Sequence, residues 1–243
     1  MIETRGLTKR FGALDVLRGI DLCVAPARVT GIVGPNGAGK TTLMKIVLGL
    51  TRADAGTVLL DGQAIGDDER YRTRIGYMPQ IARYPENLTA AELFAMLRDL
   101  RGDARATDDE LLDTFGLRDQ MSKKLRVMSG GTRQKVNAAL AFFFTPDLLI
   151  LDEPTAGLDP VSAGTLKDKI RRERAAGRTI IVTSHIMSEL EELCDEVVFL
   201  LDGAIRFSGS VHDLKASTRQ TSLERAVAVM MMKGETNTGG AAA

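Results

Sequence analysis

The chain has 243 residues, of which 44% are hydrophobic, and its 32 lysine and arginine residues balance 32 acidic residues. This length is sufficient for one sizeable α/β domain with a smaller inserted lobe. Because the charges cancel, no extended field of one sign points to nucleic acid or to an anionic bilayer as a partner. Any binding of phosphate must therefore depend on a local site.

Cysteine usage and hydropathy indicate the compartment. Cys23 and Cys194 are far apart and lack the spacing of metal ligands, so we interpret them as core thiols in a reducing compartment. The first four residues do not begin a basic segment followed by an apolar one, so no signal peptide is visible. The longest apolar runs, residues 138–144 and 148–151, are far shorter than the roughly 20 residues that cross a bilayer. We expect a soluble, cytosolic protein.

Short β-rich runs alternate with helical stretches along the chain. This alternation is typical of a mostly parallel sheet with crossover helices, and it predicts an α/β fold. The predicted strands are residues 29–33, 75–77, 148–151, 179–183 and 197–201. The first of them leads through a glycine-rich turn into a helical pattern at residues 41–48.

The middle third of the chain, from about residue 85 to residue 139, has a different character. Thr89 and Glu92 have the spacing of a capping box, and an apolar helix face follows at Leu93, Met96, Leu97 and Leu100. Residues 108–115 and 133–144 are further predicted helices. We therefore expect a helical lobe between the two halves of the sheet.

The C-terminal third predicts a hairpin and then a tail. Asp202-Gly203 is a hairpin turn signal between residues 197–201 and 204–207. Residues 223–232 form a short amphipathic segment, and we expect residues 239–243 to be disordered. No internal repeat is visible, which indicates a single copy of the domain.

Residues 34–41 match the P-loop pattern, with an apolar strand before them and a helix after them. The glycines let successive backbone N–H groups turn inward, and the helix N-terminus favours a triphosphate. A glycine-rich turn with an incidental lysine is the alternative, but the match is complete. We predict that nucleotide is bound by Gly34, Pro35, Asn36, Gly37, Ala38, Gly39, Lys40, Thr41 and Thr42, with Lys40 on the β- and γ-phosphates and Thr41 on Mg²⁺. This motif alone does not choose among kinases, GTPases, helicases and transport ATPases.

Two acids, Asp152 and Glu153, follow the apolar run 148–151. Ligands of open α/β sheets bind at the carboxyl ends of strands, where these acids are expected. We predict that Asp152 holds Mg²⁺ and that Glu153 polarises the attacking water as general base. An acidic strand end that only caps the turn at Pro154 is the alternative, and the P-loop in the same chain argues against it.

Several further motifs make the chain resemble the ATP-binding subunits of ABC transporters. Met128-Ser129-Gly130-Gly131-Thr132 resembles the signature sequence of that family, and residues 156–159 resemble its D-loop. Gln80 matches the Q-loop glutamine, His185 the switch histidine, and Phe11 the aromatic residue that stacks on adenine. The elements occur in the family's order over residues 3–210.

This resemblance implies a P-loop NTPase (RecA-like) core with an N-terminal antiparallel β subdomain and an inserted α-helical subdomain at about residues 85–139. Residues 1–215 would form the nucleotide-binding domain, and residues 216–243 a short helix with a tail. It also implies ATP and Mg²⁺ as cofactors, with Thr41, Gln80 and Asp152 on the metal and Glu153 and His185 as catalytic residues. Ser129, Gly130, Gly131 and Asp159 would act across the interface of a head-to-tail homodimer that encloses two ATP molecules.

The resemblance further implies a separate transmembrane permease as partner and a position at the cytoplasmic face of the membrane. Residues 223–226 resemble the closing segment of ATPases that serve ABC-2-type permeases. Residues 130–141 and 154–161 resemble the ATPase of nitrous-oxide-reductase copper-site maturation systems. Met128 and Thr132 depart from the usual leucine and glutamine of the signature, so contacts between subunits are expected to differ. The alternatives are a generic ABC-2-type exporter, a non-transport ABC ATPase, a translation-type factor, and a plain P-loop kinase or regulatory binding module. Non-transport ABC ATPases carry long coiled coils or zinc modules, and translation-type factors carry tandem cassettes. None of these features is visible in this sequence.

Overall fold

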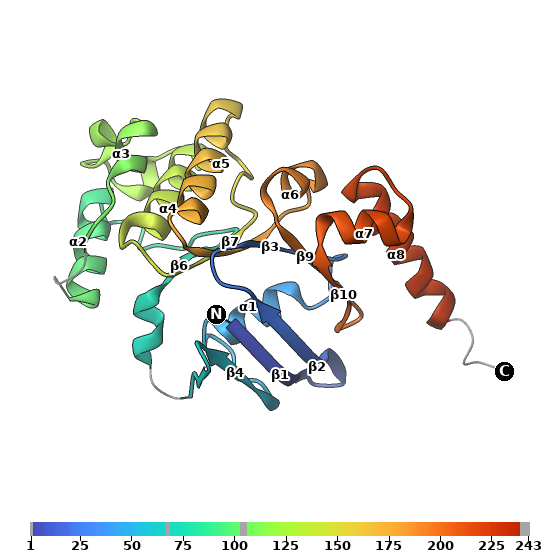
Figure 1. Ribbon diagram of the computed structural model, residues 1–243. Helices are drawn as coiled ribbons and strands as arrows, with labels where there is room; N and C mark the ends of the chain where they lie inside the picture. Colours follow the sequence, from blue (N-terminus) through green and yellow to red (C-terminus); the bar gives the residue numbers. More distant parts are fainter. Residues whose placement is uncertain (1, 67–68, 103–105, 239–243) are drawn as a thin grey trace.

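The computed structural model describes residues 2–66, 69–102 and 106–238, with side chains as far as residue 232. Two sheets and the helices around them make up this part of the chain (Figure 1). Within it, no helix combines the length and the apolar character needed to cross a membrane.

The main sheet has six strands in the order β10-β9-β3-β8-β7-β6. Five of them run parallel, and β10 pairs antiparallel with β9. The strands are β3 (Val29–Val33), β6 (Ile75–Met78), β7 (Leu148–Asp152), β8 (Thr179–Thr183), β9 (Glu196–Leu201) and β10 (Ala204–Ser210). All the strands predicted from β-rich runs are therefore present. Their near-continuous apolar sequences reflect burial on both faces of the sheet.

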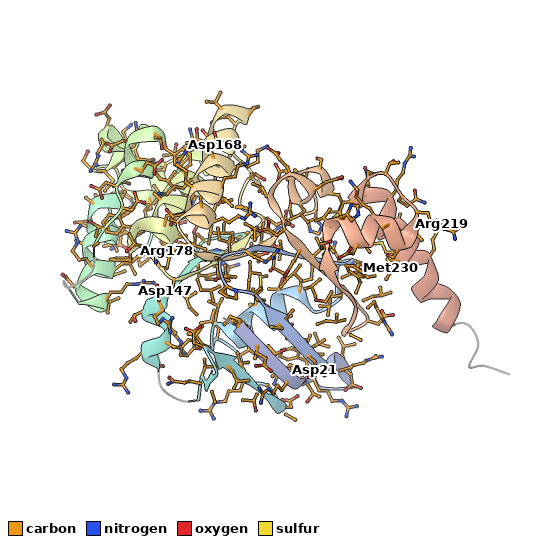
Figure 2. The ribbon with its side chains drawn as sticks, in the orientation of Figure 1. Asp21, Asp147, Asp168, Arg178, Arg219 and Met230 are labelled. Carbon is orange, nitrogen blue, oxygen red and sulfur yellow. The ribbon has the colours of Figure 1, made fainter. Side chains whose placement is uncertain are left out.

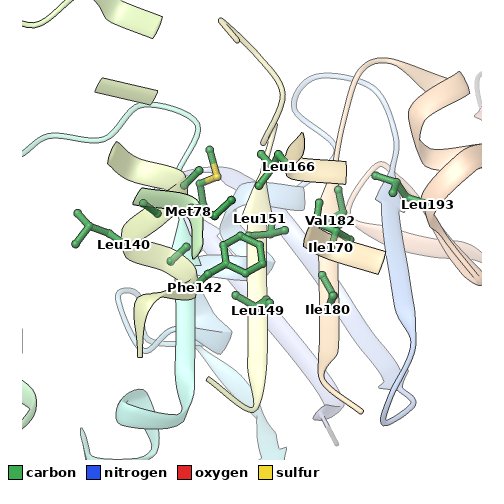
Figure 3. Close-up of a cluster of buried hydrophobic side chains, with 14 of the residues drawn as sticks. Met78, Leu140, Phe142, Leu149, Leu151, Leu166, Ile170, Ile180, Val182 and Leu193 are labelled. Atoms are coloured by element: carbon green, nitrogen blue, oxygen red, sulfur yellow. The ribbon is translucent and has the colours of Figure 1, made fainter. Parts of the chain in front are cut away.

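Alternate side chains of each central strand enter two different cores, because successive residues of a strand point to opposite faces. On β7, Leu149 and Leu151 join the core under α4 (Gly130–Phe143), α5 (Pro160–Ala175) and α6 (Met187–Leu193) (Figure 3). Leu148 and Ile150 join the opposite core, which contains α1 (Lys40–Val47). The central strands are thus held rigidly between two apolar layers.

A second, antiparallel sheet lies beyond α1, in the order β2-β1-β4-β5. Its strands are β1 (Ile2–Phe11), β2 (Leu14–Val24), β4 (Ala55–Leu60) and β5 (Gln63–Ala64). Its apolar face and the apolar face of α1 belong to one core.

The prediction that both cysteines are core thiols is wrong for Cys23. Cys23 is exposed because it lies on the outer face of the edge strand β2, whereas burial raises the pKa of Cys194 to about 12.

The middle third of the chain is helical, as predicted. It contains α2 (Ala90–Arg101), α3 (Glu110–Thr114), the start of α4, and short 3₁₀ turns at Arg118–Gln120 and Leu125–Val127; a further 3₁₀ segment, Glu69–Arg74, precedes β6. The predicted capping box is confirmed: the N–H of Glu92 donates to Thr89 Oγ1 at 3.1 Å, and the N–H of Thr89 donates to Glu92 Oε2 at 2.8 Å. α4 continues past residue 139, and the limits 85–139 for a subdomain stay a prediction.

The C-terminal part begins with the predicted hairpin, in which Asp202 and Gly203 have φ values of +49° and +72°. Two helices follow, α7 (Val211–Thr218) and α8 (Leu223–Thr238), so α7 crosses residue 215 and α8 is longer than the predicted 223–232. The N–H of Leu223 donates to Glu191 Oε2 at 2.9 Å, which fixes the start of α8 to α6. Ala226 and Val227 are also buried, and only the far end of α8 projects from the body of the molecule (Figure 1). Residues 239–243, for which we expected disorder, lie outside the described residues.

Candidate active site

Four loops meet at one edge of the main sheet. They follow β3, β8, β7 and β6, which are consecutive neighbours in the parallel part of the sheet. The carboxyl ends of parallel strands lie at the same edge, so the P-loop, His185, the pair Asp152 and Glu153, and Gln80 are brought to it in this order. These residues are spread over positions 34–185 of the chain, and the strand order brings them together.

Glycine is required at two positions of the P-loop. Gly34 has φ +152°, and a Cβ there would collide with the backbone oxygen of Leu200. Gly39 has φ +103°, and a Cβ there would lie 2.8 Å from the backbone oxygen of Val16. The loop therefore lies against β9 and β2 without room for side chains. Gly39 is the N-cap of α1 and provides no side-chain acceptor, so the first amides of this helix remain available to an anion.

Lys40 folds over the P-loop. Its Nζ donates to the carbonyl oxygens of Gly34 at 2.6 Å and Pro35 at 2.9 Å. Burial lowers the pKa of this amine, while the charges of Glu153 and Asp152 oppose that shift. The ammonium group is thus held beside both acids, with contacts that it can exchange for phosphate oxygens.

Asp152 is buried at the end of β7, and its Oδ1 accepts a hydrogen bond from Thr183 Oγ1 at 2.5 Å. Thr183 ends the neighbouring strand β8 in register with Asp152. Nothing in the sequence motifs singled out Thr183, although a threonine at the end of a strand beside the acids is the available signal. Carboxylate, hydroxyl and amide oxygens are ligands that Mg²⁺ accepts, so the side chains of Asp152, Thr41 and Gln80 fit that ion chemically.

Among the described residues, no group of three or more His, Cys, Asp and Glu side chains is arranged to hold a metal. Mg²⁺ is commonly bound by one or two protein ligands together with substrate phosphates rather than by a cage of protein ligands alone. The donor set of Thr41, Gln80 and Asp152 belongs to this type.

Glu153 has an unusual backbone for a residue with a Cβ. Its φ is +53°, in the left-handed region that costs energy for residues other than glycine. The conformation is fixed from β8: the N–H of Glu153 donates to Thr183 O at 3.1 Å. The N–H of His185 donates to Glu153 Oε2 at 3.1 Å, and His185 Nε2 lies 3.2 Å from Glu153 Oε1. The two predicted catalytic side chains therefore touch, and the imidazole remains 54% exposed.

The signature residues lie at the start of α4. Ser129 is the N-cap of this helix and accepts a hydrogen bond from the N–H of Thr132 at 3.1 Å. The Thr132 hydroxyl, which replaces the usual glutamine, lies 2.8 Å from Ser129 Oγ. A Cβ at Gly131 would lie 3.3 Å from the carbonyl oxygen of Gly157, so the signature adjoins the D-loop. Ser129 and Gly130 are exposed.

Asp159 serves as the N-cap of α5, as its position before Pro160 allows. Its carboxylate accepts from the N–H of Ser162 at 2.9 Å and from Ser162 Oγ at 2.7 Å, and Lys135 Nζ lies 3.1 Å away. These contacts, those to Ser162 foremost, hold the pKa of Asp159 well below its usual range. The contacts available within one chain thus engage both carboxylate oxygens.

Phe11 and Gln80 are both accessible. Phe11 ends β1 and is 52% exposed, and Lys9 Nζ lies 5.2 Å from the centre of its ring. An exposed ring that already faces a cation is suited to stacking on a base. Gln80 lies two residues beyond the end of β6 and is exposed.

Comparisons with known proteins identify the family. The family model described as ABC transporter matches residues 17–156. The chain belongs to the ABC transporter family, and it is an ATPase of the ATP-binding-subunit type.

Two curated relatives resemble most of the chain. The Nod factor export ATP-binding protein I of Ralstonia nicotianae is 36% identical over 88% of this chain and 68% of its own length. The daunorubicin/doxorubicin resistance ATP-binding protein DrrA of Streptomyces peucetius is 38% identical over 89% of this chain and 67% of its own length. Both relatives therefore extend beyond the part that this chain matches.

Two solved structures share the fold. The ATP-binding subunit of an ABC transporter has a TM-score of 0.87 and 29% identity, covering 95% of this chain and 99% of its own. A dimeric ATP-binding cassette in a post-hydrolysis state bound to ADP and Pi has a TM-score of 0.78 and 23% identity, covering 87% and 99%. The predicted P-loop NTPase fold with an antiparallel β sheet and helical part is confirmed.

Proposed function

We propose that this chain is the ATP-hydrolysing subunit of an ABC exporter and that it drives a separate transmembrane permease. The observation that carries the proposal is the contact between Glu153 and His185 at the sheet edge that also holds the P-loop. A carboxylate fixed beside an imidazole and a phosphate cradle is suited to activating water against a phosphoryl group.

In this proposal the P-loop amides and Lys40 bind the β- and γ-phosphates, and Phe11 stacks on the adenine. Thr41, Gln80 and Asp152 would hold Mg²⁺, and a bound Mg²⁺ would neutralise part of the phosphate charge. Glu153 accepts the proton of the attacking water. His185 contacts Glu153 and donates a hydrogen bond to the γ-phosphate, so that the water is aligned with the phosphorus atom. The strained backbone of Glu153 fixes its carboxylate before substrate arrives, which reduces the cost of reorganisation.

The active site is completed by a second copy of the chain. Ser129 caps the start of α4, and within one chain its hydroxyl is bonded to the N–H and hydroxyl of Thr132 rather than to the P-loop. Exposed apolar side chains adjoin three of the motifs: Val127 precedes the signature, Val161 follows Asp159, and Ile186 follows His185. Burial of these side chains between two copies would favour a head-to-tail homodimer. The dimeric cassette of similar fold supports this assembly.

The permease is proposed to dock beside Gln80, which places the chain at the cytoplasmic face of a membrane. A cavity of about 300 Å³ lies there between the main sheet and the helical part. It is lined mainly by apolar side chains, among them Tyr77, Pro79, Tyr84, Leu97, Leu140 and Phe144. An apolar helix of the permease matches this lining. The printed names of the relatives, export of Nod factor and resistance to a drug, favour export as the direction.

A narrower proposal is that this ATPase takes part in the maturation of nitrous oxide reductase, where ATP hydrolysis would drive the delivery of copper or sulfur. It rests on the resemblance of residues 130–141 and 154–161, which form most of α4 and the D-loop. Met230 and Met231 pack against the apolar core, so they are not counted as copper ligands in support of it. Met230 lies on α8 (Figure 2). Identification of the permease distinguishes this system from other ABC-2-type exporters and from a non-transport ATPase.

Hydrolysis is tested with two substitutions of the full chain. Glu153→Gln should lower kcat at least a hundredfold while nucleotide affinity stays within about twofold, because the carboxylate acts on water and not on ATP. Lys40→Ala should instead weaken nucleotide binding. Glu196→Gln, a carboxylate at the start of β9, is the matched control and should keep the parental rate. Wild-type turnover by Glu153→Gln would overturn the assignment.

Permease docking is tested by charge reversal beside the cavity. Glu86 and Arg83 are exposed, and Glu86 Oε1 lies 3.7 Å from Arg133 Nη1. Arg83→Glu combined with Glu86→Arg should abolish co-purification of a polytopic membrane protein and leave the ATPase rate of the isolated chain unchanged. Loss of ATP binding in this variant would show that the docking surface is misplaced.

A further inference from the structure

Asn137 is a fully buried polar residue in the middle of α4. Its Nδ2 donates to the carbonyl oxygen of Pro79 at 2.8 Å, and its Oδ1 accepts from Tyr84 Oη at 2.9 Å. Nδ2 also lies 3.4 Å from Gln134 Oε1, one turn earlier in the helix. Both donors and the acceptor of the amide are therefore used, as the burial of an amide requires.

The two partners of Asn137 flank Gln80. Pro79 immediately precedes Gln80, and Tyr84 follows four residues after it. Between them the chain has no helix or strand, and Gln80 and Ile81 are exposed. One buried side chain thus fastens both ends of an otherwise irregular segment to α4. Burial raises the pKa of Tyr84, so its hydroxyl stays a donor at neutral pH.

Asn137 also lies between two sites of the proposed function. Pro79 and Tyr84 both line the cavity beside the helical part, and Ser129 begins the helix that carries Asn137. A movement of the cavity wall or of α4 would therefore be transmitted to the backbone of Pro79, next to Gln80, through the 2.8 Å hydrogen bond from Asn137. Packing alone would give no such direct link to the backbone at Pro79.

We propose that Asn137 is a positioning residue for Gln80: it sets the reach of the Gln80 amide into the nucleotide site by holding Pro79 and Tyr84 on α4. The inference rests on the proposed function, in which Gln80 contributes to the site of the nucleotide and Mg²⁺. It assigns to Asn137 no contact with nucleotide or metal.

A double-mutant cycle in the full chain tests this inference. Asn137→Leu keeps the approximate volume and removes both hydrogen bonds, and Gln80→Ala removes the positioned amide. Each alone should lower kcat about tenfold, the size typical for partners that orient a ligand, while ATP affinity in EDTA stays within about twofold. Because both substitutions disable the same group, the double variant should be no slower than Gln80→Ala alone. Amide exchange at residues 80–83 should also accelerate about tenfold in Asn137→Leu.

A purely structural role for Asn137 would give a different result. The effects on kcat would multiply, so that the double variant is about a hundredfold slower, and that outcome would overturn the inference. If Asn137→Leu does not fold, Asn137→Asp serves in its place, since it keeps the acceptor for Tyr84 and loses the donor to Pro79. Thr218→Val, which removes a buried hydroxyl from α7, is the control for loss of a buried hydrogen bond and should keep the parental rate. An unchanged kcat in Gln80→Ala alone would instead contradict the proposed function of Gln80.

Discussion

Thr183 belongs to none of the recognised motifs, yet it orients both acids of the site, Asp152 and Glu153. Its hydroxyl donates to Asp152 Oδ1 at 2.5 Å, and its carbonyl oxygen accepts from the N–H of Glu153 at 3.1 Å. It therefore orients the acid proposed for Mg²⁺ and stabilises the left-handed backbone of the acid proposed as general base. A side chain of the same shape without the hydroxyl would leave one oxygen of Asp152 without this partner.

We expect Thr183→Val to lower kcat about tenfold, since it removes a hydrogen bond that orients a ligand without changing volume greatly. The rate should be measured at saturating ATP and over a range of Mg²⁺, whose half-saturating concentration should rise. Thr179→Val is the matched control: Thr179 is equally buried at the opposite end of β8, and its hydroxyl accepts from the N–H of Ala27. Equal losses in the two variants would contradict a specific role for Thr183.

The residues of the site were predictable where a motif fixes both type and spacing. Gly34, Gly39, Glu153 and His185 occupy the positions that their motifs imply, and their geometry follows from the ends of parallel strands. Thr183 and Asn137 were not predictable, because each acts through a partner that lies 31 or 58 positions away in the chain. A local pattern contains no signal for such contacts.

At the scale of elements, one buried cation joins α5 to the chain around α3. The Lys169 side chain is 4% exposed, and its Nζ bonds to Asp108, to Glu110 Oε2 at 2.9 Å and to Glu173 Oε1 at 2.8 Å. Burial alone would lower the pKa of Lys169, but these three carboxylates outweigh it and raise the pKa. The stabilisation is therefore complete below the ordinary lysine pKa of 10.5 and is lost only as the pH rises through the raised value.

Lys169→Met should lower the free energy of unfolding by about 2 to 4 kcal/mol, because it removes the buried cation shared by three carboxylates, of which Glu110 and Glu173 keep a second cationic partner, in Arg172 and Arg178. Urea denaturation at neutral pH measures this. Lys167→Met on the same helix is the matched control, since its pair with Glu192 at 2.6 Å is more exposed and should contribute less than about 1 kcal/mol. Similar losses in both variants would show that the Lys169 cluster does not hold the two parts together.

The strands that are buried on both faces were predictable from the sequence, whereas the strands with one solvated face were not. The strands of the main sheet are apolar on both faces, so their sequences stand out from the chain around them. β1 and β2 have one solvated face and several register shifts, with charged residues such as Glu3, Arg5 and Asp21 between the apolar ones. Their presence was implied only by the resemblance, not by periodicity. α8 runs past its predicted end because the apolar pattern of residues 223–232 stops at Met232, whereas the helix continues through polar sequence to Thr238.

The ion pairs at the amino edge of the sheet show that the two edges differ. Asp147, just before β7, pairs with Arg74 at 2.7 Å and Arg178 at 3.3 Å (Figure 2). Charges at this edge are thus neutralised within the chain, whereas the carboxyl edge concentrates Lys40, Asp152, Glu153 and His185 around the phosphate cradle. In the whole molecule, the predicted site residues lie at one edge of the main sheet, and the signature lies at the start of α4 beside the D-loop.

In the proposed dimer, two copies of this chain complete each other's ATP sites. Sedimentation of the Glu153→Gln variant with and without ATP and Mg²⁺ tests it most directly, because this variant should bind ATP without consuming it. We predict that ATP converts the 26.3 kDa chain into a particle of twice that mass, and that adding Ser129→Arg to the same variant prevents this. A monomer at saturating ATP, with nucleotide binding intact, would contradict the shared site.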